Sequence, residues 1–148
     1  LLSMIGLFNI FGTLTSGYLS TKFPKKLILS FIYLMRGVVI ALFIFLPPSP
    51  TLAVLFGITF GFLWLATVPP TAGIVGSIFG TKYMGLLYGI VFLSHQVGSF
   101  FGAYLGGIFK EVYGSYDYAW YVSIALSIFA GLIHLPIKEE QVKRLQAA

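Results

Sequence analysis

Five long apolar stretches occupy most of this 148-residue chain and restrict the folds open to it. We place them at residues 1–20, 27–46, 52–71, 85–109 and 118–137. Each is close to the roughly 20 residues that an α-helix needs to cross about 30 Å of hydrocarbon. Strands of a membrane barrel would be about half as long and would alternate apolar with polar residues. The pattern therefore predicts an all-α membrane protein, with five transmembrane helices over residues 1–137 and a polar tail over 138–148.

The composition excludes several other classes. Charged residues make up 9% of the chain and hydrophobic residues 58%, whereas about 25% of a typical soluble protein is charged. So few charges cannot cover a water-exposed surface, and the lipid bilayer is the expected partner. The chain has no cysteine, which excludes disulfides and thiolate metal sites. The net charge of +5 does not predict nucleic-acid binding, because the basic residues lie at segment ends rather than along a groove.

Basic residues also predict the orientation. If the five segments alternate in direction, the side that holds the C-terminus receives Lys22, Lys25, Lys26, Lys82, Lys138, Lys143 and Arg144. The opposite side receives Lys110, close to Glu111 and Asp117. An excess of lysine and arginine marks the cytoplasmic side of a membrane protein. We therefore expect a cytoplasmic C-terminus, in a plasma membrane or a bacterial inner membrane.

The ends of the segments carry two further expectations. Leu1 already lies inside an apolar segment and no charged region precedes it, so this is not a signal peptide and we expect a piece of a longer protein. Residues 72–84 contain Gly73, Gly76 and Gly80, and we interpret them as a stretch along the cytoplasmic surface. The tail after Lys138 is expected to be a short polar helix or disordered.

Three polar residues lie at similar depth, roughly 15 Å from the cytoplasmic side. They are Asn9, Arg36 and His95. Polar groups are costly at this depth, so they are usually functional or packed against protein. Asn9 shares its helix face with small and hydroxyl residues, which favours either an interhelical hydrogen bond or a wet cavity. A partner for Arg36 would be a backbone carbonyl, a substrate anion or an acid elsewhere, since none of the five segments contains an acid.

The fourth segment combines a packing signal with polar residues. Gly98, Gly102 and Gly106 form a double GxxxG ridge, which lets another backbone approach closely. His95 lies one turn before Gly98, on the same face, and Gln96 lies beside Ser99. His95 is thus either a structural residue or a group that binds substrate or a proton.

Trp64 and Thr67 lie one turn apart in the third segment. Trp64 either stacks on a ligand or fills the core. The chain lacks the HExxH, GxSxG and phosphate-loop motifs of enzymes. We therefore predict no enzyme, no cofactor and no metal site.

The loop after the first segment reads Gly17-Tyr-Leu-Ser-Thr-Lys-Phe-Pro-Lys-Lys26. It resembles the signature loop of the major facilitator superfamily, roughly Gly-x-Leu-Ala-Asp-Arg-x-Gly-Arg-Lys. Glycine, leucine and basic positions are kept at Gly17, Leu19, Lys22, Lys25 and Lys26. Thr21 and Pro24 replace the acid and the second glycine, so this stretch lacks the acid that contributes to the charge-helix gate of the family.

The stretch 89–107 is similar to the eleventh helix of bacterial members related to monocarboxylate and oxalate/formate carriers. The resemblance implies helices eight to twelve of a twelve-helix fold, with an N-terminal half missing from this chain. The C-terminal part of the central cavity would then be lined by helices that carry Asn9, Trp64, Thr67, His95 and Gln96. Arg36 would fall on the ninth helix, which usually lies at the periphery.

These observations predict secondary active transport of a small organic solute, with a carboxylate as first candidate, by alternating access. A proton gradient (symport) or an exchanged solute (antiport) would drive it, and His95 is the candidate proton-sensitive group. The alternative is a non-transporting, receptor-like or assembly subunit that binds a partner through the glycine ridge. An intramembrane enzyme is the least supported class.

Overall fold

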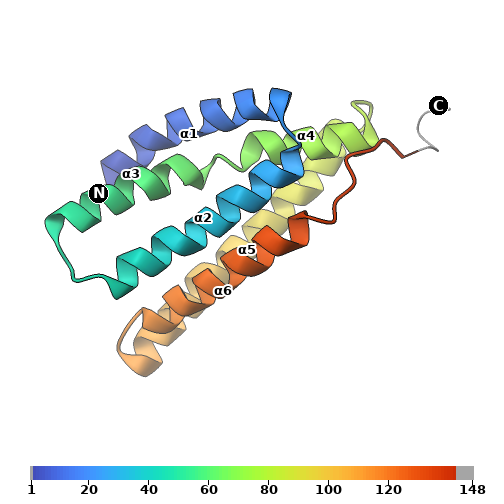
Figure 1. The fold of residues 1–148 in the computed structure, drawn as a ribbon. Coiled ribbons are helices and arrows are strands. Elements are labelled where there is room, and N and C mark those ends of the chain that lie inside the picture. The colour runs from blue at the N-terminus through green and yellow to red at the C-terminus, as the bar shows by residue number, and fades with distance from the viewer. Residues whose placement is uncertain (1, 143–148) are drawn as a thin grey trace.

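The computed structural model describes residues 2–142 of the chain and is all-α, as predicted. Its helices, shown in Figure 1, are α1 (Leu2–Lys22), α2 (Lys25–Phe45), α3 (Pro50–Trp64), α4 (Val68–Phe79), α5 (Met84–Tyr113) and α6 (Asp117–His134). Four stretches within the described residues are long and apolar enough to cross a membrane: 2–22, 25–45, 50–79 and 84–113. The fifth predicted segment corresponds to α6, which has 18 residues and is not among these four.

The third predicted segment differs most from expectation. We expected one helix over 52–71 and a surface stretch over 72–84. Instead α3 ends at Trp64, and α4 begins at Val68 and continues to Phe79. Pro69 and Pro70 stand in the first turn of α4, where the missing N–H groups of proline cost least. The proline pair therefore marks a helix start rather than a helix end.

Helix α2 lies at the centre of the bundle (Figure 1). It packs along α6 on one side, and on α3 and α4 on the other, while α1 packs mainly along α3. The buried core joins Ile28 and Ile32 of α2 to Leu63 and Ala66 at the α3–α4 junction. Burial of these side chains thus fixes the position of the helix break against α2.

Glycines allow α1 and α3 to meet backbone to backbone. A Cβ atom at Gly12 would fall on the backbone of Phe62, and one at Gly61 would lie 2.6 Å from the backbone of Ile5. Side chains larger than hydrogen would push the helices apart, so these two positions fix the distance between them.

Helix α5 is packed least. None of its residues is buried, and within the described chain it packs mainly on α4 and α6. Cβ atoms built at Gly98, Gly102 and Gly106 meet no described atom within 4 Å. The ridge has no neighbour in this part of the protein, so close packing at these glycines stays a prediction.

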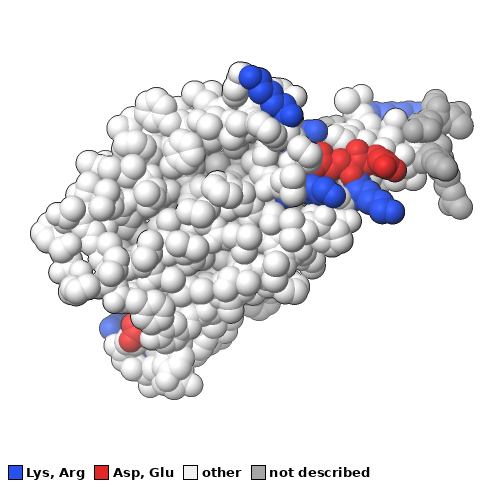
Figure 2. Space-filling model, viewed as in Figure 1, with Lys and Arg blue, Asp and Glu red and all other residues white. Residues whose placement is uncertain are grey.

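Charged side chains gather at the end of the bundle where α1 ends and α2 begins, and a small basic and acidic group lies at the opposite end (Figure 2). This is the distribution that alternating segments predict. After α6 the chain is irregular through residue 142, and it packs against α2 and α4 instead of forming a helix. The remainder of the predicted tail, residues 143–148, lies outside the described residues.

Candidate solute site

Two neighbouring cavities open between α2, α5 and α6, at the level of the α3–α4 break. The larger has a volume of about 520 Å³ and the smaller about 440 Å³. Tyr33 and Arg36 of α2 line both, together with His95 and Ser99 of α5. Trp64 and Thr67 line the larger one. The structure thus brings together four of the six residues that the sequence predicts to bind solute.

Arg36 is held by the end of α3. Its Nε atom donates to the carbonyl oxygen of Leu63 at 3.1 Å, and Nη2 donates to the same oxygen at 2.7 Å and to the carbonyl of Trp64. In an unbroken helix these two carbonyls would accept from the N–H groups of Thr67 and Val68. Here the N–H of Val68 bonds to the carbonyl of Leu65 instead. The sequence leaves three partners open for Arg36: a backbone carbonyl, a substrate anion or an acid elsewhere. The structure shows backbone carbonyls.

Asn9 supports the same break from α1. Its Oδ1 accepts a hydrogen bond from the N–H of Leu65 at 2.9 Å. Asn9 does not line either cavity. Its neighbours on this helix face, Gly12 and Gly17, pack against Phe62 and Pro69. The structure therefore shows Asn9 in an interhelical hydrogen bond, and it leaves a direct role in solute binding without support.

Aromatic rings surround the guanidinium of Arg36. Its Cζ atom lies 5.2 Å from the ring centre of Tyr33 and 6.0 Å from that of Trp64, within the range of cation–π attraction. His134 of α6 stacks on Tyr33 with ring centres 5.2 Å apart and also lines the larger cavity. Trp64 is 49% exposed, so it forms part of the cavity wall rather than the core.

His134 and Tyr33 line the larger cavity, although the sequence does not predict either of them as a solute-binding residue. The position of His134 near the end of its segment favours an interfacial residue, and only the packing of α6 on α2 brings it to the cavity. Tyr33 stands three residues before Arg36, on the same helix face, which is the one signal for it in the sequence.

The remaining predicted residues lie differently. His95 is exposed on α5, and its ring faces that of Phe92 at 6.3 Å. Gln96 is also exposed but lines neither cavity. The geometry thus separates these two neighbours, and a solute contact by Gln96 stays a prediction.

The cavity walls carry cationic and neutral groups only. The titratable side chains that line them are Tyr33, Arg36, Tyr88, His95 and His134. These include both histidines of the chain. Among the residues described, neither wall includes an aspartate or glutamate, and no cluster of three or more metal-binding side chains occurs. Such walls favour a negatively charged solute over a cation.

The signature stretch, residues 17–26, spans the end of α1 and the start of α2 and contacts α4 and the tail. Gly17 lies against Pro69 of α4, and Leu19 packs on the core around Ile28. The Nζ atom of Lys22 lies 4.5 Å from the ring centre of Tyr18. Lys25 and Lys26 begin α2, where both contact Glu139 of the tail.

Comparison with known proteins agrees with the helices, the loop and the distribution of charge. The sequence profile described as Major Facilitator Superfamily matches residues 1–148. The chain belongs to the major facilitator superfamily. Members of this family are multi-pass membrane transport proteins, and the described helices agree with that architecture.

One similar superfamily protein is the uncharacterized MFS-type transporter YcxA of Bacillus subtilis (strain 168). It is 28% identical over 139 residues, which cover 89% of this chain and 33% of YcxA. The chain thus spans about a third of the length of this relative. No solved structure gives a significant match.

Proposed function

We propose that this superfamily chain is the C-terminal portion, helices eight to twelve, of a secondary active transporter for small organic anions. Carboxylates are the first candidates. A solute would bind at the cavity between α2, α5 and α6 and cross by alternating access, driven by a proton gradient or by an exchanged solute. We place the protein in a plasma membrane or a bacterial inner membrane, with the C-terminus in the cytoplasm because the basic end of the bundle lies there.

The absence of an aspartate or glutamate from the described cavity walls is the observation that supports an anion most directly. Arg36 contributes a permanent positive charge, and His95 and His134 each contribute one when protonated. The Nη1 group of Arg36 makes no hydrogen bond to the described residues. It is therefore the donor of this side chain that remains for a carboxylate, while Nε and Nη2 stay on α3.

Aromatic walls favour a solute with an apolar or planar body. Trp64, Tyr88 and Phe92 line the larger cavity together with Tyr33. Binding sites of this kind combine apolar walls with a few polar groups that orient the ligand. A carboxylate attached to an aromatic ring fits both features.

The open faces of α5 support the proposal that this chain works together with an N-terminal half. Its glycine ridge meets no described atom, and this chain matches a third of a longer relative. The remainder of the protein would pack on this helix and close the cavity from the other side. The alternative of a non-transporting subunit rests on the same ridge, which a second protein would then occupy.

Uptake into proteoliposomes that contain the intact protein tests the charge preference. Benzoate, benzamide and benzylammonium share one ring and differ in charge. We expect uptake of benzoate to exceed that of protein-free vesicles, in which the neutral acid already permeates and is trapped in an alkaline lumen, and we expect no such protein-dependent excess for the amide or the amine. Equal uptake of all three, or preference for the amine, would contradict an anion site.

Substitution of His95 tests the proton-linked role. In His95→Ala we expect the dependence of benzoate uptake on external pH to flatten, because one titratable group leaves the cavity. Leu93→Ala is the control, since Leu93 is exposed on the same helix and does not line either cavity. An unchanged rate and pH profile in His95→Ala would remove His95 from the mechanism.

A further inference from the structure

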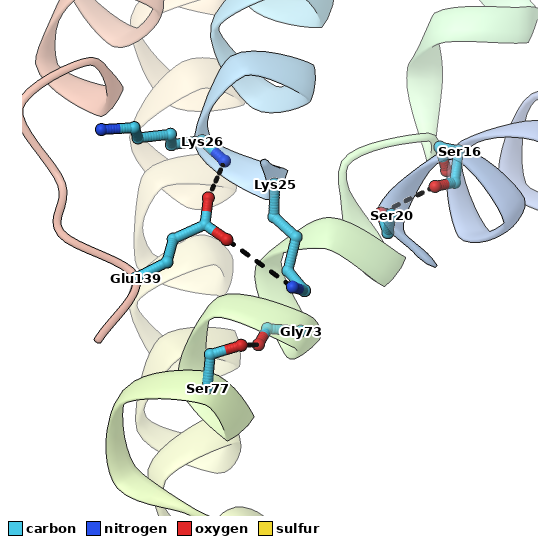
Figure 3. A network of polar contacts seen from close by, with 7 residues as sticks. All are labelled: Ser16, Ser20, Lys25, Lys26, Gly73, Ser77 and Glu139. Atoms are coloured by element: carbon cyan, nitrogen blue, oxygen red, sulfur yellow. Dashed lines mark hydrogen bonds and ion pairs between the residues drawn. The ribbon is translucent and has the colours of Figure 1, made fainter. Parts of the chain in front are cut away.

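The tail after α6 returns to the bundle and joins two helices at its charged end. Figure 3 shows its contact with the start of α2, through Glu139. Oε1 of Glu139 accepts a hydrogen bond from the backbone N–H of Lys26 at 2.6 Å, and Oε2 lies 3.6 Å from Nζ of Lys25. Three residues later, the N–H of Val142 donates to the carbonyl of Ile78 at 3.0 Å. One short segment thus binds the start of α2 and the end of α4.

Each contact gives a hydrogen-bond partner to a backbone group that has none within its own helix. The first N–H groups of a helix and its last carbonyls lack partners within the helix. Pro24, which precedes α2, has no side chain that can accept from them. Glu139 supplies that acceptor from the tail, and its negative charge lies at the positive end of the helix dipole. At the other helix, the N–H of Val142 donates to the carbonyl of Ile78 in the last turn of α4.

The side chain of Lys25 contacts both α4 and the tail. Its aliphatic stem lies against Gly73 of α4, where a Cβ atom would approach Cδ of Lys25 to 2.6 Å. Its ammonium group pairs with Glu139, and the two side chains are 23% and 16% exposed. An ion pair shielded to this degree is screened less by salt than one in open solvent.

We propose that residues 138–142 form a strap that holds α4 against α2 at the charged end of the bundle, with Glu139 as its main anchor. The strap restrains the half of the third span that follows the break at residues 65–67. Movement of the end of α4 away from α2 requires the strap to release. This inference does not depend on the proposed solute.

Hydrogen–deuterium exchange of the Val142 amide in the intact protein, reconstituted in lipid nanodiscs, tests the strap. This amide lies three residues from Glu139, so substitution there leaves its intrinsic exchange rate unchanged. We expect exchange to be about tenfold faster in Glu139→Ala than in wild type, since a hydrogen bond to a charged group is lost. Glu139→Gln should be intermediate because the amide oxygen still accepts. Glu140→Ala, next to it and exposed, should match wild type.

A pair of lysine variants distinguishes the strap from general charge attraction. Lys26 contributes only its backbone N–H to Glu139, whereas Lys25 contributes its side chain. Lys25→Ala should therefore accelerate Val142 exchange roughly two- to fivefold, and Lys26→Ala should leave it unchanged. Both variants lose one positive charge.

Two outcomes would overturn the proposal. One is a wild-type Val142 amide that exchanges as fast as an unstructured peptide. The other is equal acceleration in Lys25→Ala and Lys26→Ala. The lysine pair remains decisive even if Glu139→Ala folds poorly, because neither lysine variant removes the acceptor from α2. Exchange of the α2 core amides in every variant reports whether the bundle itself is intact.

Discussion

Arg36 and Asn9 act on opposite sides of one helix break. Arg36 binds the carbonyls that α3 leaves free, and Asn9 binds the N–H of Leu65. Inside a bilayer no water is available to these groups, so unpaired carbonyls and amides would be costly. A long cation and a short amide thereby make a discontinuous span compatible with the membrane interior.

Removal of either side chain should destabilise the bundle. We expect Arg36→Leu to lower the free energy of unfolding by about 1–3 kcal/mol because two carbonyls lose a charged donor. Asn9→Leu should cost roughly 0.6–1.7 kcal/mol, the range of hydrogen bonds between membrane helices. Unfolding of the intact protein in detergent, followed by circular dichroism, measures both.

Thr15→Val is the control for these two variants. The Thr15 hydroxyl bonds only to the carbonyl of Phe11 in its own helix, so its loss should have little effect. If Arg36→Leu were as stable as this control, the contacts with α3 would not support the break.

Two glycines of α1 differ in how closely another helix approaches them. Gly12 lies against the backbone of Phe62, whereas Gly6, on the same helix, has no described atom within 4 Å of a Cβ. We expect Gly12→Ala to destabilise the bundle by about 1–3 kcal/mol, the usual cost of overpacking. Gly6→Ala should be neutral or stabilising, since alanine favours helix by up to about 1 kcal/mol over glycine. Melting temperatures of the two variants compare them directly.

The same comparison can contradict the helix pairing. If Gly6→Ala were the damaging change and Gly12→Ala the silent one, α1 would pack through a different face from the one described.

At the scale of helices, the sequence predicts where the helices lie better than it predicts the break between α3 and α4. Each apolar run contains helix in the structure, but the third run is divided between α3 and α4, and α6 is not among the four stretches long and apolar enough to cross a membrane. The break escapes detection because residues 63–68 are almost entirely apolar, and the following proline pair is as compatible with a helix end as with a start. Depth along the segments groups Arg36 with His95, which line the same cavities, and with Asn9, which lines neither. It does not find His134, which only the packing of α6 on α2 brings to the cavity.

The whole molecule is packed unevenly. Helices α1, α2 and α3 share a buried core, while α5 buries no residue over its 30-residue length. In the intact protein we expect the rest of the chain to cover α5. Phe100→Cys and Phe31→Cys place a reporter on α5 and on α2, at side chains that are 64% and 62% exposed here.

A maleimide reagent should label Phe100→Cys much more slowly in the intact protein than in residues 1–148 alone. Phe31→Cys should react similarly in both, because α2 is already packed on the faces that meet other helices. Equal labelling of Phe100→Cys in both would mean that the remainder of the protein does not cover this helix.

Under the proposed transport of an anion, a cavity whose described walls hold no acid also constrains the electrical character of the cycle. Arg36 keeps its positive charge beside peptide carbonyls, which accept its hydrogen bonds but carry no charge to neutralise it. In the proposed cycle, protons would be carried by His95 and His134, which line the larger cavity. A monovalent anion that crosses with one proton moves no net charge. With protons on both histidines, the same step would carry one positive charge across the bilayer. Current on a solid-supported membrane therefore distinguishes the cases. Net negative charge, no net charge and net positive charge would correspond to no, one and two protons carried with each monovalent anion.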